Sequence, residues 1–265
     1  MKRIAFHVNG EKPAAHDACS RLTAYAREIG LTVLDYAGAA TDGACDAVIV
    51  LGGDGTMLSA VHRFPGIPLL GLNLGSLGYL AGVDEPHFEE ALRALRDGTY
   101  SISRRTALGA RGHVALNDIV FSRGTSGHAA VIALSVDGQP ATRFFADGLV
   151  VATPTGSTAY SLAAGGPILL PDSQAFVITP VCPHALGSRP LVVRDSARLS
   201  IQLHARPGAE TLEVFADGDA VVQLHGDEEI VVEKAAATVP LVELPGTNPF
   251  AVLSRKLGWS GSRIQ

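Results

Sequence analysis

Hydrophobic positions follow two alternating patterns over the first hundred residues. Short runs that are almost entirely apolar predict buried strands at residues 3–8, 31–34, 47–50 and 68–72. In other segments, apolar side chains recur every three or four residues, which predicts helices around residues 18–29 and 88–95. Because strands that alternate with helices favour a parallel sheet covered on both faces, we expect an α/β domain over residues 1–100.

The pattern changes after residue 100, where short strand-like runs alternate with turns. Residues 131–136 and 142–145 flank the turn sequence Asp137-Gly138 and predict a β-hairpin. Further β-like runs follow at residues 198–204, 213–215, 220–224 and 229–232. This part of the chain is therefore expected to be rich in antiparallel hairpins.

These patterns define the expected domains. The second domain is β-rich, covers residues 101–247 and contains one glycine-rich helical insert near residues 155–165. Residues 248–265 form a tail, helical over 249–259, that we expect to pack back on the first domain. The sequence contains no polar linker, which favours a firm boundary over a flexible tether.

Composition and charge exclude several classes of protein. The 265 residues are 47% hydrophobic and 18% charged, as expected for a folded globular chain. The net charge of −5 gives no overall basic surface for nucleic acid, so an anionic ligand must be met locally. Three cysteines without a Cys-x-x-Cys pair favour a reduced, cytoplasmic compartment. The apolar runs are too short for a signal peptide or a membrane span.

The sequence Gly-Gly-Asp-Gly-Thr at residues 52–56 follows a predicted buried strand and precedes a helix-compatible segment. Its glycines let backbone amides approach a ligand closely, while Asp54 places a carboxylate at the same turn. A carboxylate repels phosphate unless a metal ion intervenes or the carboxylate deprotonates a hydroxyl that attacks phosphorus. The motif therefore indicates phosphoryl transfer. The alternative is a tight turn in which Asp54 caps the helix.

Two further glycine-rich turns point to the same kind of site. Residues 71–80 follow the next predicted strand, and turns after neighbouring parallel strands converge on one crevice. Residues 147–167 form a strand, then a turn crowded with hydroxyls, then a short helix that Ser157 or Thr158 can cap. The free amides of that helix could face a ligand.

A polar pair, Asn117-Asp118, interrupts an apolar run and is costly to bury unless its groups are satisfied. An amide beside a carboxylate suits an adenine edge and ribose hydroxyls. The alternative is a bulge or turn with a purely structural role.

Taken together, these motifs resemble the NAD kinase family. The matching stretches, in the family's order, are residues 52–58, 75–80, 115–118, 147–167, 179–184, 188–192 and 257–259. The Gly-Gly-Asp-Gly-Thr motif is shared with lipid kinases and phosphofructokinases, whereas residues 147–167 are much more specific. The resemblance implies an α/β domain with a Rossmann-like parallel sheet, followed by a β-sandwich-like domain.

The resemblance also implies roles for particular residues. Asp54 would be the general base that takes the proton from the 2′-hydroxyl of the adenosine ribose of NAD. Asp147 would face the nicotinamide end, and residues 158–160 would line the adenine pocket. The full set of implied dinucleotide-binding residues is Gly55, Asn117, Asp118, His128, Phe145, Asp147, Thr158, Ala159, Tyr160, Ser161, Leu162, Ala163 and Asp219. Asp118, Phe145 and Asp219 differ from the residues common in the family at these positions.

The implied reaction transfers a phosphoryl group from ATP or polyphosphate to NAD, giving NADP. Mg²⁺ or another divalent cation would bridge the donor phosphates, and no residue is assigned as a metal ligand. The family usually forms homodimers or homotetramers. Two alternatives stay open: a diacylglycerol-type lipid kinase, although no basic amphipathic stretch is evident, and a dinucleotide sensor without catalysis, which would gain nothing from an anion at Asp54.

Overall fold

The computed structural model describes residues 1–8, 10, 13–35, 45–75, 78–125, 127–204 and 211–259. The chain folds into two compact units. The first unit comprises residues 1–104 together with the segment from 239 onward, and the second comprises residues 105–238. Each unit has its own sheet system and its own hydrophobic core.

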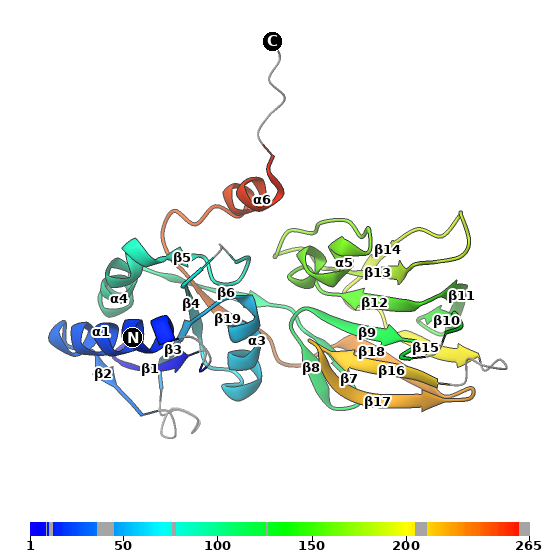
Figure 1. Ribbon diagram of the computed structural model, residues 1–265, viewed down its shortest axis with the longest axis horizontal. Helices are drawn as coiled ribbons and strands as arrows, with labels where there is room; N and C mark the ends of the chain where they lie inside the picture. The colour runs from blue at the N-terminus through cyan, green and yellow to red at the C-terminus, as the bar shows by residue number, and fades with distance from the viewer. Residues whose placement is uncertain are drawn as a thin grey trace, which may run out of the picture. The chain divides into compact units, whose positions relative to one another are not determined.

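The first unit is built on a seven-stranded, mostly parallel sheet within the described residues (Figure 1). Its strands are β1 (Arg3–Val8), β2 (Thr32–Val33), β3 (Ala47–Leu51), β4 (Leu69–Asn73), β5 (Val83–Asp84), β6 (Ser101–Arg105) and β19 (Val239–Glu243). The order across the sheet is β2-β1-β3-β4-β19-β6, and β5 pairs with β4. The strands β1 to β5 form parallel pairs, as the alternation of strands and helices predicts.

Helices cover both faces of this sheet. The helical elements of the unit are α1 (Pro13–Glu28), α3 (Asp54–Arg63), η1 (Glu85–His87), α4 (Phe88–Asp97) and α6 (Pro249–Leu257). The helices α1 and α4 pack against Ala47, Ile49 and Leu51 of β3, which point to one face of the sheet. The helix α3 contacts β1, β3 and β4 and buries Met57, Ala60 and Val61. The predicted α/β domain is confirmed.

The second unit consists of two six-stranded sheets whose recorded pairs are all antiparallel. One sheet has the order β11-β10-β15-β18-β7-β8, from β7 (Leu108–Ala110), β8 (His113–Ala115), β10 (Ala130–Val136), β11 (Gln139–Ala146), β15 (Leu199–His204) and β18 (Glu229–Lys234). The other has the order β14-β13-β12-β9-β16-β17, from β9 (Asp118–Ser122), β12 (Gly148–Ala152), β13 (Ala175–Val181), β14 (Leu191–Arg194), β16 (Thr211–Ala216) and β17 (Asp219–His225).

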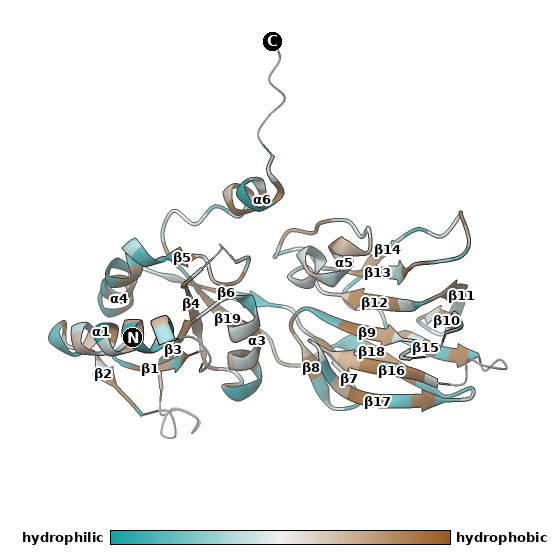
Figure 2. Cartoon of the chain, viewed as in Figure 1, coloured by the Kyte–Doolittle hydropathy of each residue, from teal (hydrophilic) through white to brown (hydrophobic). Residues whose placement is uncertain are grey.

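One apolar core joins the two sheets of the second unit. It combines Ile132 and Ile201 from the first sheet with Phe121, Val151 and Phe176 from the second, all fully buried. Figure 2 shows the hydrophobic residues concentrated along these strands. Strands with alternating burial, such as β15 and β16, present one apolar face to this core. The β-rich, sandwich-like domain expected from the sequence is therefore present.

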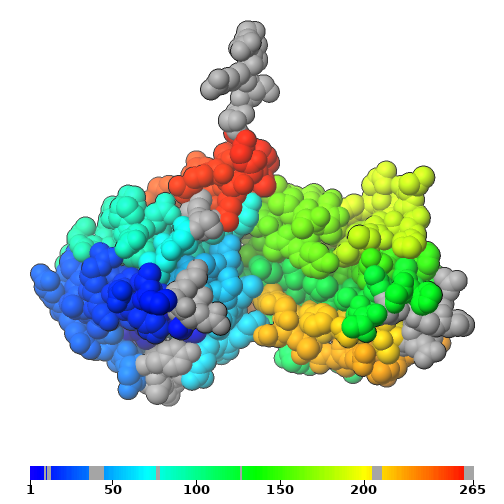
Figure 3. Space-filling view, viewed as in Figure 1, coloured from blue at the N-terminus to red at the C-terminus, as the bar shows by residue number. Residues whose placement is uncertain are grey.

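The chain returns to the first unit earlier than the expected boundary at residue 248. Residues 239–243 form β19, whose Leu241 pairs in parallel with Leu69 of β4. The short apolar run therefore completes the α/β sheet. The helix α6 follows and ends at Gly258, whose φ of 65° lies in the left-handed region. Arg255 of α6 pairs with Asp84 at 3.4 Å, and Figure 3 shows α6 lying against the first unit's own atoms.

Within the described residues, no helix has the length and apolar character needed to cross a membrane.

Candidate functional site

The Asp54 carboxylate is held by the backbone of a neighbouring loop. Asp54 is the first residue of α3, the helix N-cap is Gly53, and no side chain caps this helix end. The two carboxylate oxygens of Asp54 instead accept N–H groups of Tyr79 at 2.9 Å, Leu80 at 2.9 Å and Ala81 at 3.3 Å. The structure thus excludes the alternative in which Asp54 merely caps its own helix.

The close approach of this loop depends on a glycine. A Cβ atom added to Gly78 would lie 2.1 Å from Oδ1 of Asp54, which is far inside van der Waals contact. The loop follows β4, and Asp54 follows the adjacent parallel strand β3. The two glycine-rich turns therefore meet at the carboxyl ends of neighbouring strands, as predicted. Residues 76 and 77 of this loop lie outside the described residues.

The position of Asp54 leaves room for chemistry. Asp54 is partly exposed, and the adjacent Gly55 is exposed. An ionised carboxylate offers about four lone-pair positions, and the loop amides occupy three of them. No other described residue donates to this carboxylate, so a further position can accept a hydrogen bond from a ligand hydroxyl, as a general base requires.

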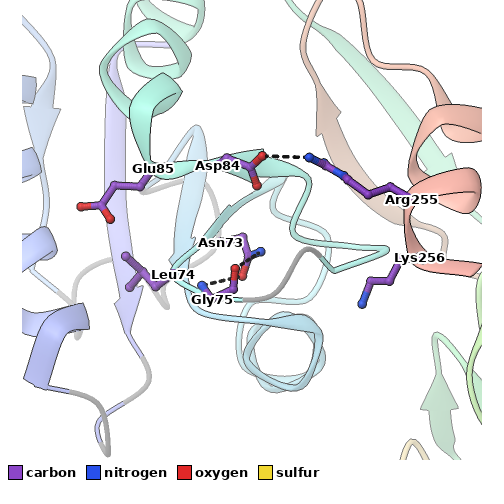
Figure 4. Close-up of a pocket in the computed structure, with 7 residues that line it drawn as sticks. All are labelled: Asn73, Leu74, Gly75, Asp84, Glu85, Arg255 and Lys256. Atoms are coloured by element: carbon purple, nitrogen blue, oxygen red, sulfur yellow. Dashed lines mark hydrogen bonds and ion pairs between the residues drawn. The ribbon is translucent and has the colours of Figure 1, made fainter. Parts of the chain in front are cut away.

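A cavity of about 620 Å³ opens beside this loop in the first unit (Figure 4). Its lining residues are Asn73, Leu74, Gly75, Asp84, Glu85, Arg255 and Lys256. Figure 4 shows Asn73 linked to Gly75, where the Asn73 side chain both donates to and accepts from the Gly75 backbone at 3.1 Å. The Lys256 ammonium lies 5.2 Å from the ring centroid of Tyr79, whose N–H binds Asp54.

In the second unit, the pair Asn117-Asp118 is organised by Asp217. The Asp217 carboxylate accepts the backbone N–H groups of Leu116 and Asn117 at 2.7 Å each, and that of Asp118 at 3.2 Å. The N–H of Asp217 donates back to the carbonyl of Asp118 at 3.0 Å. The backbone N–H groups of this pair are therefore satisfied by a residue about a hundred positions away in the chain.

Asp118 carries the most perturbed carboxyl group of the described residues. It is 6% exposed at the start of β9. Burial, and secondly the nearby negative charge of Asp217, raise the pKa of Asp118 to about 7. Asp118 therefore changes its protonation state near neutral pH.

Thr153 connects this pair to the glycine-rich turn that follows β12. The buried Thr153 hydroxyl donates to the Leu116 carbonyl at 2.6 Å, and the Thr153 N–H donates to the Asn117 carbonyl at 2.9 Å. The same hydroxyl accepts the N–H of Gly156 at 3.0 Å. A Cβ atom on Gly156 would lie 2.0 Å from the Asn117 carbonyl oxygen, so this contact requires glycine.

Two family models match most of the chain. The family model described as the ATP-NAD kinase N-terminal domain matches residues 6–100, and that of the ATP-NAD kinase C-terminal domain matches residues 116–244. An NAD kinase of Syntrophotalea carbinolica is 36% identical over 284 aligned residues, covering 98% of this chain and 99% of that protein. The chain belongs to the NAD kinase family. It is accordingly a phosphotransferase.

Solved structures of NAD kinases share the fold. Yeast NADH kinase, solved in complex with NADH, has a TM-score of 0.87 at 24% identity, covering 100% of this chain and 90% of that chain. An NAD kinase from Archaeoglobus fulgidus, solved in complex with ATP, has a TM-score of 0.80 at 24% identity, with 98% and 99% covered. At this identity the likeness shows the fold alone.

The capping expected at the NAD kinase motif 147–167 is wrong in detail. Thr153, not Ser157 or Thr158, accepts the first N–H of the turn formed by η2 (Gly156–Thr158). The Ser157 hydroxyl donates to the Pro154 carbonyl at 2.6 Å, and the Thr158 hydroxyl donates to the Thr155 carbonyl at 3.1 Å. Thr153 lies three residues before Gly156, and its hydroxyl therefore reaches the Gly156 N–H directly.

The short helix α5 (Tyr160–Ala163) carries the other residues that the NAD kinase resemblance assigns to the adenine pocket. Tyr160 is 45% exposed and available to a ligand. Ser161 is fully buried, and its hydroxyl shares a hydrogen bond with Thr179 at 2.8 Å. Leu162 is partly exposed, Ala163 is exposed and Ala159 is partly exposed. Tyr160 and Ser161 thus differ: one presents its ring to solvent, and the other fastens α5 to β13.

Asp147, implied for the nicotinamide end, and Phe145, implied as a dinucleotide-binding residue, lie near the opposite end of β12. Asp147 precedes this strand and pairs with Arg123 at 2.9 Å, whereas Thr153 follows the strand. The rise of about 3.4 Å per residue separates the two ends by roughly 20 Å. The exposed Phe145 ring contacts the His184 ring at a centroid distance of 4.6 Å. The structure therefore gathers Asn117, Asp118 and residues 153–158, but not Asp147 or Phe145, into one cluster.

The last two implied NAD kinase positions are at the surface. His128 and Asp219 are both exposed, and Asp219 opens β17 two residues after Asp217. Asp217 and Thr153 themselves were not predicted as site residues from sequence. The available signal was the turn sequence Asp217-Gly218, which resembles the predicted hairpin turn Asp137-Gly138.

Proposed function

We propose that the protein phosphorylates the 2′-hydroxyl of the adenosine ribose of NAD, with ATP as donor, and so produces NADP. Membership of the NAD kinase family supports the reaction class. The observation that carries the assignment of the base is the partly exposed Asp54 carboxylate, which three loop amides hold in one orientation.

In the proposed reaction, Asp54 accepts the proton of the 2′-hydroxyl as the oxygen attacks the terminal phosphorus of ATP. The bond between that phosphorus and the bridging oxygen breaks, and ADP leaves. Phosphoryl transfer depends mostly on positioning and on neutralising charge. The loop amides contribute positioning, because they hold the carboxylate in one orientation before the acceptor arrives.

The acceptor is proposed to bind through the residues that the family resemblance assigns. Asn117 and Asp118 hold the adenosine moiety, and residues 158–160 line the adenine pocket, with Tyr160 offering an exposed aromatic face. Asp147 is assigned to the nicotinamide end, where its charge is shared with Arg123. Gly55 lies against the dinucleotide beside Asp54.

A divalent ion such as Mg²⁺ is proposed to arrive with the donor phosphates. Magnesium is commonly held by substrate phosphates plus one or two carboxylates, with several waters. Among the described residues, no three His, Cys, Asp or Glu side chains form a group that could hold a metal ion. When bound, the ion neutralises charge on the donor.

The decisive experiment is an incubation of the purified protein with NAD, ATP and MgCl₂, followed by detection of NADP with an NADP-specific dehydrogenase. We expect NADP to accumulate in proportion to enzyme and time. Diacylglycerol vesicles in place of NAD test the lipid-kinase alternative, and polyphosphate in place of ATP tests the second donor. Binding of NADP without any turnover of NAD would support the sensor alternative and contradict the proposal.

Two further features belong to the proposal. The free cysteines Cys19, Cys45 and Cys182 suit a reduced compartment, so we place the enzyme in the cytoplasm. The family resemblance favours a homodimer or homotetramer, which light scattering of the purified chain measures directly. The proposed partners are NAD and ATP, with neither nucleic acid nor membrane required.

A further inference from the structure

Asp217 forms four hydrogen bonds with the backbone of the segment Leu116–Asp118. Its two carboxylate oxygens accept three consecutive N–H groups, and its own N–H closes a fourth hydrogen bond to the Asp118 carbonyl. Asp217 lies in the turn between β16 and β17 with a φ of 51°, a left-handed conformation that Asp and Asn tolerate better than most residues. This turn therefore holds the Asn117-Asp118 pair in one conformation.

The same contacts extend to the glycine-rich turn. Leu116 and Asn117 are bound to Asp217 through their N–H groups and to Thr153 through their carbonyls. Thr153 in turn holds the N–H of Gly156, where η2 begins. Displacement of Asp217 would thus release the N–H groups of residues 116–118, the segment to which Thr153 joins the glycine-rich turn.

Asp217 also sets the electrostatic surroundings of Asp118. The strand β9 lies between β12 and β16. On the β12 side, Asp118 is opposite Ala152, followed by Thr153, and neither is charged. At the end of β16, Asp217 supplies the negative charge that acts on Asp118. Burial and this charge both favour the protonated form of Asp118.

We propose that Asp217 is a positioning residue for the dinucleotide site, and that its charge beside Asp118 couples NAD binding to pH. This inference rests on the proposed function, because it assumes that Asp118 accepts hydrogen bonds from ribose hydroxyls. An ionised Asp118 accepts two such bonds, whereas a protonated one has less accepting capacity. Binding of NAD should therefore strengthen as Asp118 loses its proton.

The test uses the Asp217→Asn variant of the full chain. Asparagine keeps the size of the side chain and tolerates the left-handed turn, but it removes the charge and one accepting oxygen. The KM for NAD and kcat are measured from pH 5.5 to 9, and NAD binding is measured by calorimetry. In the wild-type protein, the KM for NAD should fall as pH rises through about 7, the pKa of Asp118.

In Asp217→Asn, two changes are expected. The KM for NAD at pH 8 should rise about tenfold or more, because hydrogen bonds to a charged acceptor are lost. The pH at which KM changes should move downward, because the neighbouring negative charge no longer opposes ionisation of Asp118. The value of kcat at saturating NAD should change much less than KM.

A matched control is available in the same unit. Asp137 occupies the turn between β10 and β11 with a φ of 52°, and its carboxylate accepts the N–H of Arg198 at 2.9 Å. The turn is equivalent to that of Asp217, but Asp137 binds Arg194 and Arg198 instead of the adenosine residues. Asp137→Asn should therefore keep the wild-type KM and its pH dependence.

Several outcomes would overturn the inference. An unchanged KM in Asp217→Asn would do so, and so would a raised KM whose pH dependence has not moved, since that result indicates a purely structural role. If Asp217→Asn does not fold, Asp118→Asn provides the test, because it should abolish the pH dependence of NAD binding. Persistence of that dependence would contradict the inference. Failure of the wild-type chain to make NADP would instead contradict the proposed function.

Discussion

Asp54 and Asp118 are both carboxylates at the start of a regular element, yet their surroundings differ in one decisive respect. Backbone amides of residues 79–81 donate directly to Asp54, which stays partly exposed. The corresponding amides around Asp118 donate to its neighbour Asp217, and Asp118 itself is buried. Asp54 is thus a fixed, partly exposed carboxylate, whereas burial and then the negative charge of Asp217 raise the pKa of Asp118 to about 7.

This contrast explains how one chain can carry two acidic residues with separate tasks. Asp54 has its amide donors in place before any ligand arrives, so a ligand hydroxyl meets a carboxylate of fixed orientation. Asp118 meets its ligand with a charge that depends on pH and on Asp217. Separate substitutions of Asp54 and of Asp118 therefore distinguish the role of the general base from that of the pH-dependent binding residue.

The largest effect is expected for Asp54→Asn. The turnover number should fall by about 10²–10⁴-fold, the usual contribution of a general base, while NAD binding persists. Asp46→Asn is the matched control, because Asp46 also accepts two backbone N–H groups, from Lys2 and Arg3, at the opposite end of β3. A near-normal turnover number in Asp54→Asn would exclude Asp54 as the base.

The second effect concerns stability in Asp118→Asn. Because the pKa of Asp118 is raised to about 7 in the folded state, the folded chain holds its proton more tightly than the unfolded chain. As pH rises from about 4 to 7, ionisation of Asp118 therefore lowers the free energy of unfolding of the wild-type protein by roughly 4 kcal/mol in total.

The side chain in Asp118→Asn does not ionise, so this variant does not lose stability in that way. Its melting temperature, compared with that of the wild type by calorimetry, should rise by several degrees at pH 8. The gain should grow between pH 5 and 7 and then level off. A gain that is independent of pH would show that Asp118 does not titrate in this range.

A smaller effect is expected for Gly156→Ala, which places a methyl group 2.0 Å from the Asn117 carbonyl oxygen. The clash should cost about 1–3 kcal/mol in urea unfolding and raise the KM for NAD, because the Asn117 backbone must shift. Gly187→Ala, where an added Cβ meets nothing within 4 Å, should leave both quantities unchanged. Equal unfolding free energies and KM values in the two variants would contradict the close contact between Gly156 and the Asn117 carbonyl.

The smallest effect is expected for Arg255→Ala, which breaks the exposed ion pair between α6 and Asp84. Such pairs contribute about 0–1 kcal/mol, and salt screens them. The loss in thermal stability should therefore be slight and should disappear in high salt. A large loss that persists in salt would show that Arg255 anchors α6 through packing rather than charge.

Local patterns in the sequence predict much of the fold and the position of Asp54. Alternating strand and helix periods predict the α/β unit, and short β-like runs predict a β-rich domain, whereas the sandwich is implied by the resemblance to NAD kinases. The strand β19 escapes this reasoning because it is only five residues long, contains Pro240 and pairs with a strand far away in the chain. Short apolar runs of this kind carry too little periodicity to assign.

The contacts within the candidate site are harder to predict than the motifs. The sequence identifies Asn117-Asp118 but not Asp217, because the hydrogen bonds between them join residues about a hundred positions apart. The sequence predicts Ser157 or Thr158 as the cap, and only the backbone geometry shows that Thr153 accepts the Gly156 N–H instead. Side-chain partners depend on tertiary packing, which no local pattern records.

The central claim is that Asp54 deprotonates the adenosine ribose of NAD. A crystal structure of the protein with NAD bound measures this most directly, through the distance between the ribose 2′-oxygen and the nearer Asp54 carboxylate oxygen. We predict a hydrogen bond of about 2.6–3.2 Å. A 2′-oxygen that lies well beyond that distance, directed into solvent with no water bridging it to Asp54, would contradict the account.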